Sequence, residues 1–207
     1  MNCLEFHRLG LRDYSDTLRA MRSLTDSRTE SSSDQIWLLE HYSIYTQGVS
    51  CKDRPTGDSS DIPLVHSDRG GQITYHGPGQ LVAYLLLDIR RRGLGVRQLI
   101  NVIEKSLVTL LADLGLNAAT QPGAPGVYIA GEKIAALGLR ERSGCCYHGF
   151  SLNGDLDLKP FSRINPCGFV DLAVTSLEKQ GVSLTVAQAA DRVKAILSQA
   201  LRQTPGS

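Results

Sequence analysis

The sequence has few features that favour binding to nucleic acid or insertion into a membrane. Its 22 Lys and Arg residues are balanced by 21 Asp and Glu residues, so the net charge of +1 leaves no basic excess for a nucleic-acid backbone. The most apolar segment, LVAYLLLDI (81–89), contains Asp88 and is far too short to span a bilayer. Glu5 and Arg8 interrupt the N-terminal segment where a signal peptide needs an apolar run. We therefore expect no nucleic-acid partner and no membrane partner.

Cysteine is scarce and irregularly spaced. The five cysteines are an odd number without a C-x-x-C pair, which fits neither a disulfide framework nor a zinc site. Cys145 and Cys146 are adjacent, so in a strand their side chains point to opposite faces and do not readily share a metal ion. We therefore expect a cytoplasmic, reducing location and no metal. Any functional cysteine is then expected to act through its thiol.

Apolar periodicity predicts a mixture of helices and strands. Apolar residues recur at steps of three and four over 14–27, over 96–114, and again beyond Thr185, which predicts three helices. Short apolar runs predict strands; these are IWLLE (36–40), ITY (73–75), LVAYLLLDI (81–89), a hairpin over 126–141, and HGFSLNGDLDL (148–158), which alternates as a half-buried strand does. The order is not a strict βαβ repeat, which favours one α+β sheet domain over residues 1–207 rather than two small domains.

The segment RGGQITYHGPGQ (69–80) concentrates four glycines around one arginine and one histidine. It lacks the G-K-[ST] ending of a P-loop and the G-x-G-x-x-G pattern of a dinucleotide site, so we expect no cofactor there. A surface turn is the plain alternative. Because glycine is costly to order, four of them favour close backbone approaches that a side chain would block. The strand-like core between two glycine turns predicts a strand edge suited to an extended apolar or amide-bearing ligand.

Cys167, in RINPCGF (163–169), is the cysteine best placed for chemistry, because the Asn-Pro and Gly that flank it predict an exposed turn. A thiol with the ordinary pKa of about 8.5 is only a few per cent thiolate at neutral pH, so a nucleophile needs a nearby cation or base. Lys133 is the candidate: it is either an exposed lysine or a partly desolvated amine with a lowered pKa. His76 and His148 are either structural or partners of Cys167. The run Arg90–Arg92 is either a docking patch for an acidic protein or a solvated face.

Four ordered segments, RGGQITYHGPGQLVAY, GVYIAGEKIAALGLR, HGFSLN and RINPCG, resemble the signature segments of the lipoyl (octanoyl) transferases of lipoate biosynthesis. The resemblance runs from about Trp37 through Leu177. It implies a single α/β domain, with a mixed sheet flanked by helices, related to the catalytic domains of lipoate and biotin protein ligases. It also implies a ping-pong, ATP-independent acyl transfer from octanoyl-acyl carrier protein. The octanoyl group passes through a cysteine thioester to a lysine of a lipoyl domain, in 2-oxoacid dehydrogenases or the glycine cleavage H protein.

The same resemblance implies roles for particular residues. Cys167 corresponds to the acyl-thioester nucleophile, and Lys133 to the lysine that lowers the thiol pKa and exchanges protons. Three segments would bind the acyl group; they are Arg69, Gly70, Gly71, Gln72, Ile73, Thr74, Tyr75 and His76, then Ala136, Leu137 and Gly138, then Gly149, Phe150 and Ser151. One departure is Ser43, where the family usually has proline.

Three other functions compete with this interpretation. An ATP-dependent lipoate or biotin ligase would activate a free acid as an adenylate and would need no thiol. A non-catalytic module would bind carrier or lipoyl domains and would tolerate Cys167→Ser. A cysteine hydrolase would release free acid instead of forming an amide. The joint presence of NPCG and GEKI favours the transferase.

Overall fold

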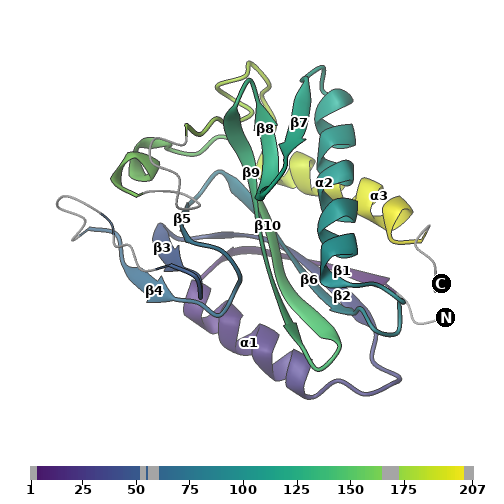
Figure 1. The fold of residues 1–207 in the computed structure, drawn as a ribbon. Coiled ribbons are helices and arrows are strands. Elements are labelled where there is room, and N and C mark those ends of the chain that lie inside the picture. Colours follow the sequence, from purple (N-terminus) through teal and green to yellow (C-terminus); the bar gives the residue numbers. More distant parts are fainter. Residues whose placement is uncertain (1–3, 52–54, 56–60, 165–172, 203–207) are drawn as a thin grey trace.

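The computed structural model describes residues 4–51, 55, 61–164 and 173–202 (Figure 1). In chain order the elements are β1 (Leu4–Arg12), α1 (Tyr14–Asp26), β2 (Asp34–His41), β3 (Ile44–Gln47), β4 (Leu64–His66), β5 (Ile73–His76), β6 (Gln80–Asp88), α2 (Val96–Ala112), β7 (Ala118–Gln121), β8 (Ala124–Ile129), β9 (Glu132–Arg142), β10 (Cys145–Asn153), the 3-10 helix η1 (Lys159–Arg163) and α3 (Val186–Ala200).

The strands of the described residues form two sheets. The large sheet has seven strands in the order β1-β2-β6-β10-β9-β8-β7, and the small sheet has three in the order β4-β3-β5. In the large sheet β1 and β2 run parallel, while every other neighbouring pair is antiparallel. The predicted mixed sheet is therefore confirmed. The predicted strand ITY is β5, one of the two edge strands of the small sheet.

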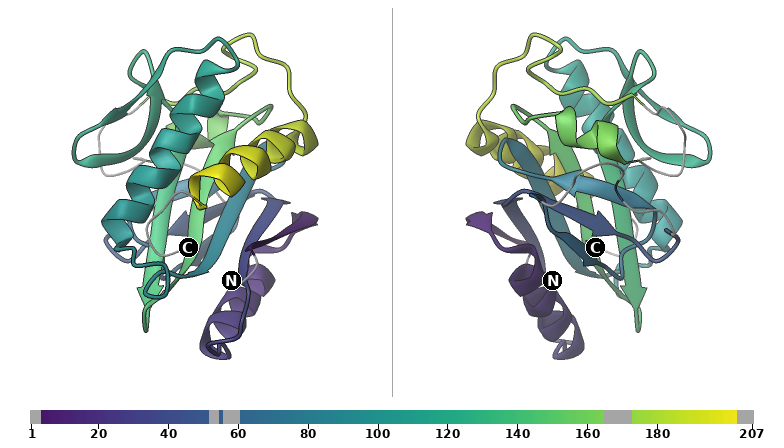
Figure 2. Two further views of the ribbon diagram at one scale, coloured as in Figure 1. Left: turned by 90° about the vertical axis from the view of Figure 1, so that its right-hand side faces the viewer. Right: turned by 90° about the vertical axis from the view of Figure 1, so that its left-hand side faces the viewer.

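Both faces of the large sheet are covered by other elements. Along β6, residues 81, 83, 85 and 87 pack in a core with α2 and α3, whereas residues 82, 84 and 86 pack with α1. Ile44 of β3 and Val65 of β4 also contact the α1 core, so the small sheet lies on the α1 side. Figure 2 shows α2 and α3 on one face and the small sheet with η1 on the other.

The helices begin where the sequence signals predict. Asp13 caps α1 by accepting a hydrogen bond from the backbone N–H of Asp16, and Thr185 caps α3 by accepting one from Gln188. α2 ends at Ala112, two residues before the predicted end at Leu114. None of the helices in the described parts of the chain combines the length and the apolar character needed to cross a bilayer.

The prediction for the strand over 148–158 was wrong in three respects. β10 begins three residues earlier, at Cys145, and ends five residues earlier, at Asn153, where the next two backbone N–H groups turn to the carbonyl of Gly79. All nine of its residues are also buried. The reason is its central place in the sheet, between β6 and β9, with covering elements on both faces. Its polar residues alternate with apolar ones, but they face a second buried layer instead of water. The predicted hairpin is confirmed: β8 and β9 reverse at Ala130 and Gly131, whose φ angles are 49° and 86°.

The basic run Arg90–Arg92 was interpreted as either a docking patch for an acidic protein or a solvated face. Neither describes Arg91 and Arg92. Arg91 and Arg92 both bind the carboxylate of Asp34, which also accepts a charged hydrogen bond from Arg28. The Asp34 side chain is only 2% exposed, and its Oδ1 also accepts the backbone N–H of Asp88 at 2.9 Å. One buried carboxylate therefore joins β2, the end of β6 and the turn that follows it.

We expect Asp34→Ala to lower the free energy of unfolding by about 3 kcal/mol or more, because it leaves guanidinium groups at a desolvated site without their anion. Chemical denaturation measures the change. Asp16→Ala is the matched control, because Asp16 makes an exposed ion pair with Arg19; its loss should cost less than about 1 kcal/mol. Similar effects of the two substitutions would contradict a structural role for Asp34.

Candidate active site

A pocket lies on the α1 side of the large sheet, over the centre of β9 and β10. Its floor is made of very small residues that face one another across the two strands: Ala136 pairs with Ser151, and Gly138 pairs with Gly149. On the opposite face of the same strands, Ala135 and Leu152 pack into the core beneath α2. Because alternate strand residues point to opposite faces, the strands can be well packed on one side and hollow on the other.

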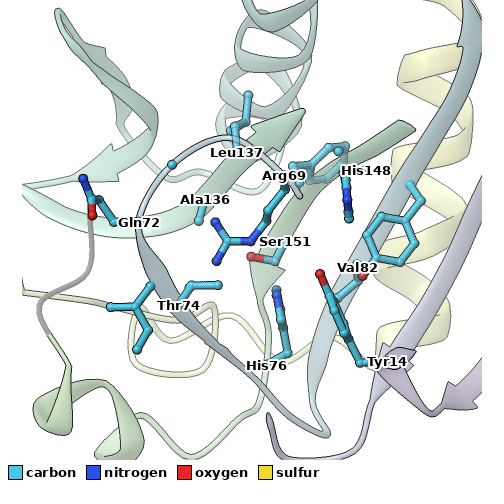
Figure 3. Close-up of a pocket in the computed structure, with 16 residues that line it drawn as sticks. Tyr14, Arg69, Gln72, Thr74, His76, Val82, Ala136, Leu137, His148 and Ser151 are labelled. Carbon is cyan, nitrogen blue, oxygen red and sulfur yellow. The ribbon is translucent and has the colours of Figure 1, made fainter. Parts of the chain in front are cut away.

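The walls of this pocket, called the main pocket here, come from three other parts of the chain. Thr74 and His76 of β5 line one side, and Arg69 to Gln72 lie over β9. Tyr14, from α1, closes part of the remaining side (Figure 3). The space between these walls, including the part that is open to solvent, is about 540 Å³. The lining is predominantly apolar, with a few hydrogen-bonding groups, as in many small-molecule sites.

Arg69 is a buried residue that shapes the wall. Its NH2 group donates to the Thr46 carbonyl at 2.6 Å, and its NH1 group donates to the Gly70 carbonyl at 3.0 Å. These bonds hold the loop against β3, and the N–H of Gly70 donates to the carbonyl of Leu139 at 3.0 Å, which holds it against β9. Arg69 and the backbone of Gly70 together hold the loop between β3 and β9.

The four glycines of 69–80 serve the packing of the protein more than contact with a ligand. Only Gly71 lines the main pocket. A Cβ at Gly77 would collide with the phenol of Tyr75, and a Cβ at Gly79, where φ is +86°, would collide with the carbonyl of Asp155. The expectation of close backbone approaches is confirmed, but at Gly77 and Gly79 the approaching atoms belong to the protein.

Lys133 lies in a smaller cavity beside the main pocket, here called the Lys133 cavity. The lysine is 3% exposed, so of the two possibilities left open by the sequence the structure shows the buried one. Its Nζ donates to the carbonyl of Pro125 at 3.2 Å and lies 5.1 Å from the centre of the Tyr128 ring. Gly126 gives it room, because a Cβ there would come within 3.3 Å of Nζ. Cys167 lies outside the described residues.

The two spaces are neighbours that share part of their lining. Thr74, Ala136 and Ser151 line both the main pocket and the Lys133 cavity, whose space, including any part open to solvent, is about 290 Å³. A buried amine therefore adjoins the hollow that the small floor residues leave. Among the described residues, no three His, Cys, Asp or Glu side chains are grouped as a metal ion would require.

The other end of the main pocket is enclosed by polar rings. One of these rings is His148, and burial, the largest influence, lowers its pKa. In neutral His148 the Nε2–H group donates to Asp68 Oδ1 at 2.9 Å. Burial alone would raise the pKa of Asp68, but hydrogen bonds from His148, Tyr147 and Arg22 outweigh it and hold that pKa well below its usual value. The remaining ring nitrogen, Nδ1 of His148, is buried without a hydrogen-bond partner in the described structure.

Two further histidines, His41 and His76, are held neutral beside the main pocket. Burial lowers the pKa of His76 to about 3 and that of His41 to about 4, from the ordinary 6.5. The Nδ1–H of His76 donates to Gln80 Oε1 at 2.7 Å, which leaves Nε2 as the acceptor. His41 accepts the Tyr84 hydroxyl at 2.7 Å on Nε2 and donates from Nδ1 to the Arg12 carbonyl at 3.0 Å.

The structure brings most of the expected acyl-site residues together. The main pocket is lined by twelve of them, namely Arg69, Gly71, Gln72, Ile73, Thr74, His76, Ala136, Leu137, Gly138, Gly149, Phe150 and Ser151. Gly70 and Tyr75 are not among its lining residues. Tyr75 packs instead with Tyr45 and Phe161 in the core of the small sheet. Ser43, the departure from the family pattern, hydrogen-bonds the Tyr75 hydroxyl at 3.0 Å.

Sequence reasoning missed three residues of the lining, Tyr14, Val82 and Tyr84. His148, which it considered only as a structural histidine or a partner of Cys167, also lines the main pocket. Val82 and Tyr84 lie on β6, which was predicted as a strand from its apolar run. Because the run is apolar on both faces, it does not show which of its residues face a pocket. Tyr14 begins a helix 55 residues before Arg69, and no local pattern connects the two.

The fold is that of the catalytic domains of lipoate and biotin protein ligases. A putative lipoate protein ligase from T. acidophilum, solved with bound lipoic acid, superposes with a TM-score of 0.76 at 15% identity, covering 98% of this chain and 87% of that one. A biotin protein ligase from Aquifex aeolicus, in complex with biotin and ATP, gives a TM-score of 0.61 at 12% identity, covering 98% and 72%.

Sequence relatives define the class more narrowly. Residues 13–198 match the lipoyl protein ligase A/B catalytic domain. The octanoyltransferase of Pseudomonas putida (strain W619) is 57% identical over 175 residues, covering 84% of this chain and 81% of that protein. The octanoyltransferase of Chromobacterium violaceum is 52% identical over 185 residues, covering 89% of each. The chain therefore belongs to the lipoyl protein ligase A/B family and, within it, to the octanoyltransferases, which are acyltransferases. The resemblance of the four sequence segments is confirmed.

The neutral histidines predict how stability depends on pH. Between about pH 6 and 4.5 the unfolded chain protonates His76, whose ordinary pKa is 6.5, while the folded protein does not, so the free energy of unfolding falls as the pH falls. Each such histidine contributes a slope approaching about 1.4 kcal/mol per pH unit. We expect His76→Gln to reduce the slope by about that amount in denaturation measured across this range. An unchanged slope would contradict the assignment.

Proposed function

We propose that the protein transfers an octanoyl group from octanoyl-acyl carrier protein to a lysine of lipoyl domains, through a thioester on Cys167. The observation that carries the proposal is the buried amine of Lys133 beside a pocket floored by Ala136, Gly138, Gly149 and Ser151. An acyl chain needs an apolar slot, and acyl transfer needs a group that moves protons at its mouth. The naming of close relatives as octanoyltransferases supports the same acyl group.

The segments that flank Cys167 support its assignment as nucleophile. Before it, Phe161 of η1 lines the Lys133 cavity. After it, Val174 lines the same cavity, and the carbonyl of Ala173 accepts the backbone N–H of Lys133 at 2.9 Å. Cys167 lies between Ile164 and Ala173 and is the only cysteine in the sequence after Cys146. Residues close to both ends of this segment, Phe161 and Val174, therefore line the cavity that holds the buried amine.

A lysine and a thiol complete a balanced cycle without any external activation. As an ammonium ion, Lys133 favours the thiolate of Cys167, and each unit of pKa lowering corresponds to about 1.4 kcal/mol. The thiolate attacks the thioester carbonyl, the carbon–sulfur bond to the carrier breaks, and the departing carrier thiolate takes a proton from Lys133. The acceptor lysine amine then attacks the acyl-enzyme, Cys167 leaves as thiolate, and neutral Lys133 takes up the proton lost by the attacking nitrogen.

The energetics of the bonds explain why no nucleotide is needed in this scheme. Exchange between two thioesters is close to thermoneutral, and the amide formed in the second step is more stable than a thioester. Backbone N–H groups that point toward each tetrahedral intermediate would stabilise its oxyanion. Burial of the acyl chain contributes roughly 0.8 kcal/mol per methylene, which amounts to several kcal/mol for an octanoyl group.

Transfer to a purified lipoyl domain tests the proposal directly. With octanoyl-acyl carrier protein as donor and no nucleotide, we expect the domain to gain one octanoyl group, detected by mass. Cys167→Ser should abolish the transfer. An absolute requirement for ATP and free octanoate would favour the ligase chemistry of the structural neighbours. Release of free octanoate without acylation of the domain would favour a hydrolase, and full function of Cys167→Ser would favour a binding module.

The role of Lys133 has a test of its own. If its ammonium stabilises the thiolate, Lys133→Ala should raise the midpoint pH of Cys167 alkylation by about one unit or more, because the thiolate loses its counter-charge. Digestion and mass spectrometry assign the label to Cys167. Lys179→Ala is the control, since Lys179 is half exposed and bound to Glu132, and it should leave the midpoint in place. An unchanged midpoint in Lys133→Ala would refute the role.

A further inference from the structure

We propose that His148 and Tyr14 form a rigid stop at the inner end of the main pocket, and that this stop limits the acyl chain to about eight carbons. The inference rests on the proposed function and adds a specificity determinant to it. It concerns the end of the pocket farthest from Lys133, where the methyl end of the chain would lie.

The residues at the inner end of the main pocket are deeply buried. Tyr14, Val82, Tyr84 and His148 are between 1% and 4% exposed, whereas Gly71, across the pocket, is an exposed residue. In Figure 3, Tyr14, Val82 and His148 lie together on one side and Gln72 lies on the other. A chain that enters from the open side therefore meets the rings of Tyr14 and His148 last.

His148 reaches this position only through an unusual backbone conformation. Its φ is +62°, a left-handed value that residues with a side chain seldom adopt within a strand. By strand alternation, Cys146 and Phe150 point into the α2 core and Tyr147 points to the α1 side. The left-handed turn brings His148 to the α1 side as well, so that its ring stacks on Tyr147 at 5.0 Å and meets Tyr84 at 5.8 Å. Strain of this kind is often kept where function requires it.

Hydrogen bonds hold both rings of the stop in place. Asp68 binds Nε2 of His148 at 2.9 Å and is itself held by the Tyr147 hydroxyl at 2.6 Å and by Arg22 Nε at 3.0 Å. Tyr14 donates from its hydroxyl to Ser67 Oγ at 2.7 Å. A longer acyl chain would have to break a charged network or displace the first turn of α1. Displacing either ring would therefore cost hydrogen-bond energy, so we expect the inner end of the pocket to be rigid.

The length of the pocket matches an eight-carbon chain. Along β9 and β10, the pair Ala136–Ser151, which borders the Lys133 cavity, lies three residues from the pair Leu139–His148. Three residues of strand span about 10 Å. Seven carbon–carbon bonds of about 1.5 Å each, in an extended zigzag, span about 9 Å. A carbonyl at the Lys133 end therefore places the eighth carbon at the level of His148.

Competition between chain lengths tests the stop. The wild-type protein and its variants are given octanoyl-, decanoyl- and dodecanoyl-acyl carrier protein, and kcat/KM for transfer to a lipoyl domain is measured for each. His148→Gly removes the ring and keeps a residue that accepts φ of +62° without strain. We expect it to raise the decanoyl-to-octanoyl ratio of kcat/KM by about tenfold or more, the scale on which pockets discriminate methylenes.

Tyr14→Leu provides a second, independent variant, because it shortens the other ring of the stop without touching the strand. It should shift the ratio in the same direction. Leu18→Ala is the matched control: Leu18 is buried in the same helix one turn later but does not line the main pocket. It should leave the ratio within about twofold although it loosens the same core.

The outcomes separate this inference from the function on which it rests. If the wild-type protein transfers no octanoyl group from the carrier, the proposed function fails. If it transfers octanoyl groups but decanoyl and dodecanoyl groups equally well, there is no stop. If either folded variant keeps the wild-type ratio, or if Leu18→Ala changes it as much as they do, His148 and Tyr14 do not set the chain length.

Discussion

Two cross-strand pairs of small residues determine how the rest of the site is built. Ala136 opposite Ser151, and Gly138 opposite Gly149, leave the α1 face of β9 and β10 without bulk. The other face of the same strands carries larger apolar side chains that pack beneath α2, so the sheet remains stable while one side is hollow. α1 and the small sheet cover that hollow, and each has a core of its own, separate from the main core beneath α2.

The hollow has two chemically different ends because of how its polar groups are held. At one end the amine of Lys133 is buried against the Pro125 carbonyl and the Tyr128 ring. At the other, His148 is held neutral with the carboxylate of Asp68, next to a line of aromatic rings. In the proposed function, the amine at one end and the uncharged rings at the other would give the acyl chain a direction, with its carbonyl carbon at the Lys133 end.

Much of the fold was predictable where local patterns were strong. The caps at Asp13 and Thr185, the helical periodicities and the Ala130–Gly131 hairpin all depend on near neighbours in the sequence. The burial of β10 on both faces and the binding of Arg91 and Arg92 to Asp34 depend on contacts between distant segments, which single-sequence periodicity does not encode. At the site, the glycine-rich segment indicated most of one wall. Tyr14 and the left-handed backbone of His148 were not predictable, because packing alone selects them.

The intact mass of the enzyme after incubation with octanoyl-acyl carrier protein, without nucleotide and without acceptor, tests the proposed thioester. We expect a population heavier by one octanoyl group, with the group on Cys167 after digestion, that discharges when a lipoyl domain is added. The absence of any adduct while the domain is still acylated, or an adduct on another residue, would contradict it.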